Sequence, residues 1–128
     1  YCKEWGISEE TMQNLSEATE TMAYTRFVLE KGLSGDLLDL HVALTPCLIG
    51  YAEIGKQFQD KITQNPYGSW IKMYASAEYQ SAAFDQMNQL EKLAAGRGGE
   101  ERFTNLSKTF NQATRLEINF WEMGLNAE

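Results

Sequence analysis

Proline, cysteine and histidine are all scarce in this chain of 128 residues, which contains two prolines, two cysteines and one histidine. Two cysteines are too few for a disulfide framework and their spacing matches no metal site, which favours a reducing, cytoplasmic environment. The single histidine, His41, cannot form a metal site alone, and no Glu-x-x-His pair is present, so a di-iron helical bundle is disfavoured. We therefore expect no bound metal.

Basic residues are also in deficit, with 11 lysines and arginines against 18 aspartates and glutamates and a net charge of −7. Nucleic-acid binding needs clustered positive charge, so no nucleic-acid partner is expected. No apolar run approaches the roughly 20 residues of a membrane span, and the N-terminus has no secretion signal, so no membrane partner is expected. The chain does not begin with methionine, which indicates a piece of a longer protein. A small neutral or cationic ligand remains compatible with these deficits.

The apolar residues of the chain recur with helical periodicity, in segments that are separated by short turns. The alternation of β-branched residues that is typical of strands is absent. We predict long helices over residues 17–31, 36–60, 77–95 and 100–123, and a short one in YGSWIKMYA (67–75). Ser16 and Ser76 are the expected N-caps, and Gly32 and Gly124 the expected terminators. The helix over 36–60 is apolar around most of its first half, so it should be buried. The predicted fold class is all-α, a single bundle of largely antiparallel helices.

The stretch ALTPCLIGYAEIG (43–55) places a proline, a cysteine and a tyrosine inside this central helix. Composition alone favours Cys47 as a small buried hydrophobic residue. However, Pro46 removes a helix hydrogen bond at a cost of about 3 kcal/mol, and Tyr51 follows Cys47 by one turn. A nucleophilic thiol needs such polar neighbours. Cys47 is therefore either core filler or a nucleophile.

A carboxyl group and several tyrosines are the other candidates. Glu117 falls in the middle of the apolar stripe of the last helix, where it must be paired, protonated or bound to a ligand. The alternative interpretation is a buried salt bridge, or a position near the helix end from which the carboxyl group reaches water. Tyr24, Tyr51 and Tyr74 lie on predicted inward faces, where they either fill the core or stack on a flat heteroaromatic ligand. His41 is read as structural, because it lies two turns from Cys47 on a different face.

Three blocks of the chain, taken together, resemble the TenA/THI-4 family, whose members are also called thiaminase II or aminopyrimidine aminohydrolase. They are YTRFVLEKGLSGDLLDLHVALTPCLIGYAEIG, NPYGSWIKMYASAEYQ and EINFWEMG. The resemblance implies a haem-oxygenase-like helical bundle that binds no haem. Residues 1–128 would form the C-terminal portion of a single TenA-like domain, whose N-terminal helices are absent from this chain. Those helices would supply an aspartate for the pyrimidine and an aromatic wall.

The resemblance also implies an activity, with a role for each matching residue. It implies hydrolysis of 4-amino-5-aminomethyl-2-methylpyrimidine to 4-amino-5-hydroxymethyl-2-methylpyrimidine and ammonia in thiamine salvage, with cleavage of thiamine as a second activity. Cys47 would be the nucleophile, Glu117 the acid/base, and Tyr24, Tyr51 and Tyr74 the substrate-binding residues. No metal or organic cofactor is implied, and the protein would be a cytoplasmic homotetramer. The alternative is a non-catalytic helical module that binds a pyrimidine or a partner protein.

Overall fold

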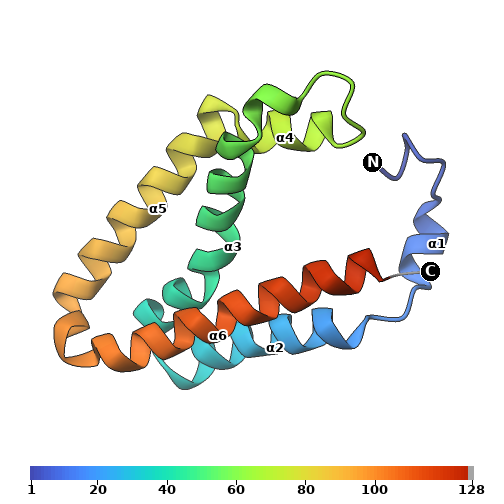
Figure 1. Cartoon of the computed structure of the whole chain (residues 1–128). Coiled ribbons are helices and arrows are strands. Elements are labelled where there is room, and N and C mark those ends of the chain that lie inside the picture. The colour runs from blue at the N-terminus through green and yellow to red at the C-terminus, as the bar shows by residue number, and fades with distance from the viewer. Residues whose placement is uncertain (127–128) are drawn as a thin grey trace.

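The computed structural model describes residues 1–126, and this part of the chain forms helices and loops with no β-strand. The helices in chain order are α1 (Glu9–Gln13), α2 (Thr19–Ser34), α3 (Leu37–Gln57), the 3-10 helix η1 (Gln59–Lys61), α4 (Gly68–Tyr74), α5 (Ala77–Gly96) and α6 (Gly99–Leu125). Helix α3 packs against α2, α4, α5 and α6. Figure 1 shows α2 and α6 running side by side, with α4 across the far end of α3. The predicted all-α fold class with a central helix is confirmed.

Two of the predicted helices begin where local hydrogen bonds dictate. The Asp36 side chain caps α3 by accepting hydrogen bonds from the backbone N–H of Leu38 and Asp39, at 2.9 and 3.3 Å. The Asp39 carboxylate accepts in return from the backbone N–H of Asp36, which completes a capping box. The Ser76 hydroxyl oxygen caps α5 by accepting from the backbone N–H of Tyr79, as the sequence predicted.

Other helix ends differ from the sequence prediction. Helix α2 begins after Ala18, which has no side-chain cap, rather than after Ser16. Gly32 and Gly124 lie inside helices instead of ending them. A Cβ atom at Gly32 would lie 3.2 Å from a methyl group of Leu40, so this glycine permits the close approach of α2 to α3. Helix α1 was not predicted; its cap is Ser8.

Helix α3 supplies much of the small buried core. Leu38 is fully buried and clusters with Val42 of the same helix and Leu106 of α6. Among the described residues, α3 is the one helix long and apolar enough to cross a membrane by length and composition, contrary to the sequence-based expectation. A core helix of a helical bundle passes the same test, and the contacts of α3 with four other helices are those of a core helix.

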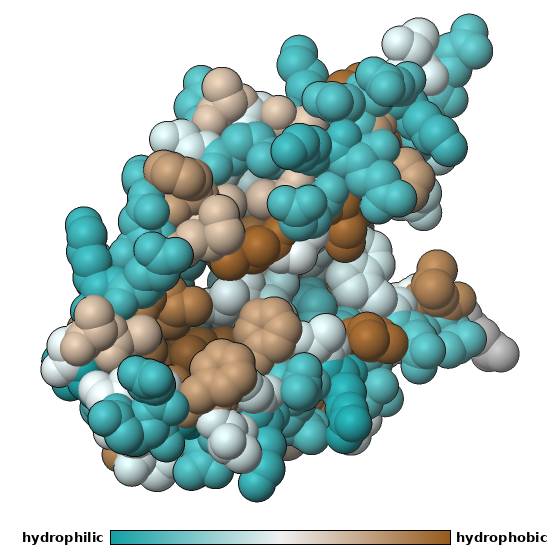
Figure 2. Space-filling view, turned by 60° about the vertical axis from the view of Figure 1, so that its left-hand side comes forward, coloured by the Kyte–Doolittle hydropathy of each residue, from teal (hydrophilic) through white to brown (hydrophobic). Residues whose placement is uncertain are grey.

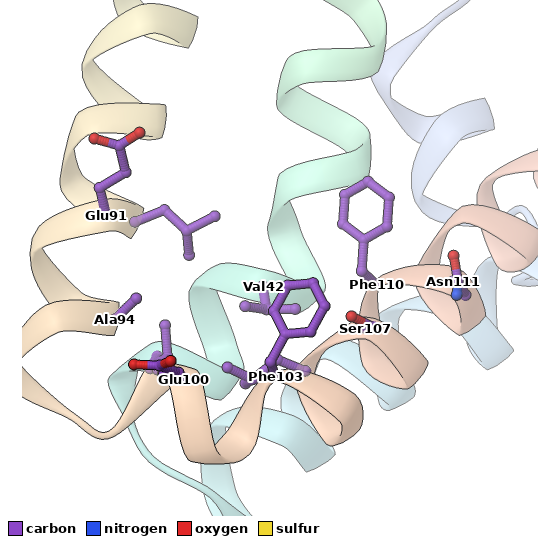
Figure 3. A pocket seen from close by; sticks show the side chains of 12 residues that line it. Val42, Glu91, Ala94, Glu100, Phe103, Ser107, Phe110 and Asn111 are labelled. Carbon is purple, nitrogen blue, oxygen red and sulfur yellow. The ribbon is translucent and has the colours of Figure 1, made fainter.

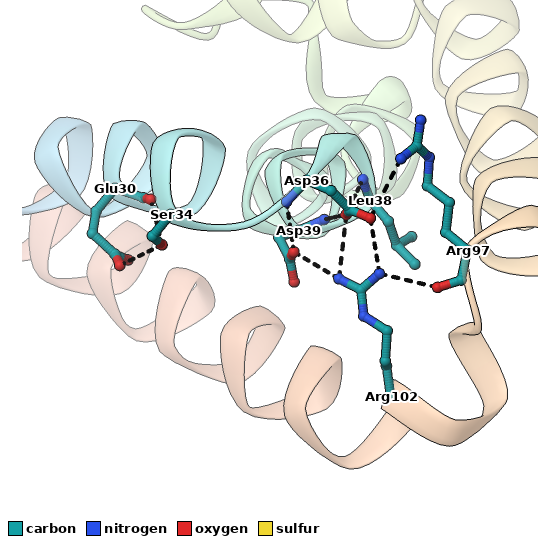
Figure 4. Close-up of polar contacts among 7 residues, drawn as sticks. All are labelled: Glu30, Ser34, Asp36, Leu38, Asp39, Arg97 and Arg102. Atoms are coloured by element: carbon teal, nitrogen blue, oxygen red, sulfur yellow. Dashed lines mark hydrogen bonds and ion pairs between the residues drawn. The ribbon is translucent and has the colours of Figure 1, made fainter.

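A charged cluster joins the start of α3 to the start of α6 (Figure 4). The Arg102 guanidinium donates to both carboxylate oxygens of Asp36, at 3.0 and 3.2 Å, and to Asp39 at 2.6 Å. It also donates to the backbone carbonyl of Arg97. These bonds from Arg102 hold the pKa of Asp36 well below its usual range. The cluster thus fixes the end of the bundle at which the chain turns from α5 into α6.

An apolar cavity of about 630 Å³ opens between α3, α5 and α6. Figure 3 shows Val42 of α3, Ala94 of α5 and Phe103 and Phe110 of α6 around it, with Glu91 and Glu100 at its edge. In Figure 2, apolar side chains gather where the surface is hollowed and hydrophilic residues surround them. The Phe103 side chain is 69% exposed. This face is therefore apolar but not covered by the described residues.

The contact between α3 and α4 depends on a glycine. A Cβ atom at Gly55 would lie 2.6 Å from the carbonyl carbon of Tyr74 and 2.8 Å from the nitrogen of Ala75. Gly55→Ala is expected to lower the free energy of unfolding by about 1–3 kcal/mol, because α4 must move away, although alanine is the better helix former. Gly50→Ala, in the same helix with no atom within 4 Å, should raise it by up to about 1 kcal/mol. Urea denaturation measures both, and equal effects would contradict the prediction.

Candidate active site

A second cavity, of about 340 Å³, is lined by three of the candidate residues that the sequence indicated. Cys47 and Tyr51 lie one turn apart on α3, and Glu117 faces them from α6. Apolar side chains such as Pro46 and Trp121 make up most of the remaining lining, together with the polar side chains of Thr114 and Glu122 from α6. Helix α3 runs without interruption through Pro46. The cavity therefore combines a thiol, a phenol and two carboxyl groups with a largely apolar wall.

The carboxyl group of Glu117 is held from one side only. The Tyr51 hydroxyl donates a hydrogen bond to Glu117 Oε1. Within residues 1–126, two buried side-chain oxygens lack any hydrogen-bond partner, Glu117 Oε2 and Tyr24 Oη. Burial first, and the nearby Glu117 second, raise the pKa of Tyr24, although no hydrogen bond of ordinary geometry joins the two side chains. Buried polar atoms are normally paired, so this pair of oxygens offers hydrogen bonds to a polar ligand.

An aromatic cluster lies behind the cavity. The rings of Tyr51 and Tyr74 are stacked, with centroids 5.0 Å apart and planes 28° apart. Trp70, one helical turn before Tyr74 on α4, packs on the Tyr74 ring with centroids 4.5 Å apart. Trp121 of α6 approaches both Tyr51 and Trp70 at slightly under 6 Å. Rings packed in this way limit the motion of Tyr51, and hence of the carboxyl group it binds.

Burial raises the pKa of the thiol and of the tyrosine hydroxyls at the site. Burial first, and Glu117 second, raise the pKa of the Cys47 thiol. Burial, followed by the hydrogen bond to Glu117, raises the pKa of Tyr51 well above its ordinary value. The pKa of Tyr74 is raised by burial and then by Cys47. At neutral pH the thiol is therefore protonated, and a nucleophilic reaction at Cys47 needs a base that takes its proton.

The structure separates the predicted site residues into two groups. Cys47, Tyr51 and Glu117 line the 340 Å³ cavity, whereas Tyr24 and Tyr74 are not among its lining residues. Tyr74 instead supports Tyr51, and Tyr24 faces Glu117 from α2. Sequence reasoning did not single out Trp121 for the site, although it lies four positions after Glu117 in the same apolar stripe.

The single histidine is not among the residues that line the cavity. His41 Nδ1 pairs with the side-chain amide of Gln86 on α5, at 2.8 Å, which agrees with a structural role. Across the described part of the chain, no three His, Cys, Asp or Glu side chains are placed to hold a metal ion. The titratable side chains that line the cavity are those of Cys47, Tyr51, Glu117 and Glu122.

Comparison with known proteins gives consistent matches over almost the whole chain. A model of the TENA/THI-4/PQQC family matches residues 1–127. An uncharacterized protein of Haemophilus influenzae is 40% identical, with 98% of this chain and 60% of that protein covered. An aminopyrimidine aminohydrolase of Halalkalibacterium halodurans is 37% identical, with 98% and 57% covered. The crystal structure of a TenA family transcription regulator from Silicibacter sp. TM1040 has a TM-score of 0.92 at 45% identity, with 98% and 58% covered. The chain spans less than two thirds of the length of these relatives.

Proposed function

Because the chain belongs to the TENA/THI-4/PQQC family, we propose that the protein is a hydrolase of aminopyrimidines with Cys47 as nucleophile and Glu117 as acid/base. The substrate is 4-amino-5-aminomethyl-2-methylpyrimidine, and the products are 4-amino-5-hydroxymethyl-2-methylpyrimidine and ammonia. Relatives named aminopyrimidine aminohydrolase, at 37% and 27% identity, support this reaction class. Thiamine cleavage is proposed as a second activity of the same site.

One observation carries the proposal. Glu117, placed beside Cys47, is anchored through Oε1 by Tyr51, while its second oxygen and the Tyr24 hydroxyl remain buried without partners. The amino group of an aminopyrimidine can donate a hydrogen bond to Glu117 Oε2. A nitrogen of its ring can accept a hydrogen bond from the Tyr24 hydroxyl. Its flat ring suits a cavity lined by Tyr51 and Trp121. Burial of the ring and pairing of both oxygens would occur together.

The reaction proceeds by addition and elimination. Glu117 takes the thiol proton of Cys47 as the sulfur bonds to an electron-poor carbon of the pyrimidine ring. Glu117 then passes this proton to the nitrogen of the 5-aminomethyl group. The bond between this nitrogen and the exocyclic carbon breaks, and ammonia leaves. Water adds at the exocyclic carbon, and its released proton returns to the sulfur as the C–S bond breaks. One water is consumed, one ammonia is released, and the thiol is restored.

We propose further that residues 1–128 are the C-terminal portion of a single TenA-like domain. The chain spans 57–60% of the length of two relatives, and the apolar face between α3, α5 and α6 carries exposed large side chains such as Phe103 and Phe110. An apolar surface of this kind is normally covered. In the intact protein, a further helical segment would cover this face and complete the pocket. The tetrameric state and the cytoplasmic location stay predictions.

The proposed function is tested by ammonia release from the aminopyrimidine. Purified intact protein is expected to release ammonia and the hydroxymethylpyrimidine in equal amounts, whereas residues 1–128 alone should turn over far more slowly. Binding of the pyrimidine without any ammonia release, detected by calorimetry, would favour the alternative of a non-catalytic binding module. Neither binding nor turnover of any aminopyrimidine or of thiamine would reject both.

A further inference from the structure

Tyr79, at the start of α5, touches two elements of the candidate site without lining its cavity. Its hydroxyl donates a hydrogen bond of 3.2 Å to the backbone carbonyl of Leu48, the residue directly after Cys47. Its ring meets the Tyr74 ring edge-on, with centroids 4.7 Å apart and planes 79° apart. Tyr79 thus contacts both the backbone that carries Cys47 and the ring that supports Tyr51.

The position of Tyr79 is itself well determined. The Ser76 cap accepts a hydrogen bond from its backbone N–H. The next residue, Gln80, donates from its side-chain amide to the carbonyls of Ala52 and Tyr74, each at 2.9 Å. The first turn of α5 is therefore tied to α3 and to the end of α4. Burial and the nearby Tyr74 raise the pKa of Tyr79 to about 12, so its hydroxyl remains a donor at physiological pH.

We propose that Tyr79 is a positioning residue of the site, an inference that rests on the proposed function. Through the carbonyl of Leu48 it holds the turn of α3 that carries Cys47. Through the Tyr74 ring it holds Tyr51, which in turn binds the Glu117 carboxyl group. One side chain on α5 thereby sets the relative position of the nucleophile and the acid/base, which lie on two other helices.

Two substitutions separate the two contacts. Tyr79→Phe keeps the edge contact with Tyr74 but removes the hydrogen bond to Leu48, so kcat should fall about tenfold while KM stays within about twofold. Tyr79→Leu removes both contacts, so KM should rise as well because Tyr51 loses its support. The Leu48 carbonyl lies within helix α3 and keeps its helix partner, so neither change should unfold the protein.

A matched control exists between the same two helices. Gln86 of α5 also makes one half-buried hydrogen bond to α3, with His41, away from the cavity. Gln86→Met removes that bond at similar volume and should leave kcat and KM unchanged, even if the melting temperature falls as in Tyr79→Phe. A wild-type kcat in Tyr79→Phe, or an equal loss of kcat in Gln86→Met, would overturn the positioning role.

A second measurement does not depend on turnover. Alkylation of Cys47 by iodoacetamide in the intact protein is followed by mass spectrometry at the peptide that contains Cys47, so that exposed Cys2 does not contribute to the measured rate. Tyr79→Phe should raise the alkylation rate about threefold or more, because the turn of α3 that carries the thiol is no longer held, and Gln86→Met should not. If the wild type shows no hydrolysis, the proposed function fails, while these rates still decide the role of Tyr79: equal rates in all three proteins reject it.

Discussion

Cys47→Ser in the intact protein is expected to lower the rate of ammonia release by at least about 10³-fold while the protein stays folded. Serine has nearly the shape of cysteine, so the half-buried position should tolerate it. A hydroxyl is far harder to deprotonate than a thiol, so the bond from the nucleophile to the pyrimidine ring would not form. The rate of ammonia release under saturating aminopyrimidine measures the effect, and circular dichroism checks the fold.

The second cysteine provides the control for this prediction. Cys2 is exposed and lies outside the residues that line the cavity, so Cys2→Ser should keep the wild-type rate. Cys47→Ala should lose activity as fully as Cys47→Ser. Near-normal hydrolysis by either Cys47 variant would show that the thiol is only a small core residue, which is the reading that composition alone favours.

Glu117→Gln is expected to lower kcat by about 10²–10⁴-fold, the range typical of a lost general acid–base group. Glutamine keeps an oxygen for the Tyr51 hydroxyl, so the packing around the site should survive. It cannot carry a proton from the thiol to the leaving amine. Glu101→Gln, which removes the same charge from the first turn of the same helix, should have no comparable effect.

The same substitution changes the ionisation of the thiol in a known direction. Glu117 is the second cause, after burial, of the raised pKa of Cys47. A negative carboxylate disfavours the thiolate, so removing its charge lowers the pKa of the thiol. When alkylation is followed at the peptide that contains Cys47, the pH midpoint for this reaction should therefore move to lower pH in Glu117→Gln. Faster alkylation combined with lost turnover would show that Glu117 is needed for proton transfer and not for the reactivity of the thiol. An unshifted midpoint would contradict the effect of the Glu117 charge on the pKa of Cys47.

Local patterns in the sequence were sufficient for the main helices. The Ser76 cap and the apolar repeat of α5 predicted that helix to within a residue at its end, because a cap acts over three residues. The placement of Cys47 and Tyr51 on one side of α3 also follows from helical periodicity alone. Their common lining of one cavity agrees with that geometry.

Helix ends and the composition of the site required tertiary contacts. Ser16 has the chemistry of a cap but is not used, and Gly32 continues a helix because Leu40 packs against it. The stacking of Tyr74 on Tyr51 depends on the backbone approach permitted at Gly55. None of these contacts can be predicted from the few residues that neighbour each position in the sequence.

The sequence by itself determined the all-α class, the central apolar helix, and the three residue types available for chemistry at Cys47, Tyr51 and Glu117. Only the tertiary structure decided that Tyr51 binds Glu117 across 66 positions and that Tyr79 reaches the carbonyl after Cys47. The physical reason is range. Periodicity and capping are set by interactions within one or two helical turns, whereas the meeting of side chains from different helices depends on how the whole bundle packs.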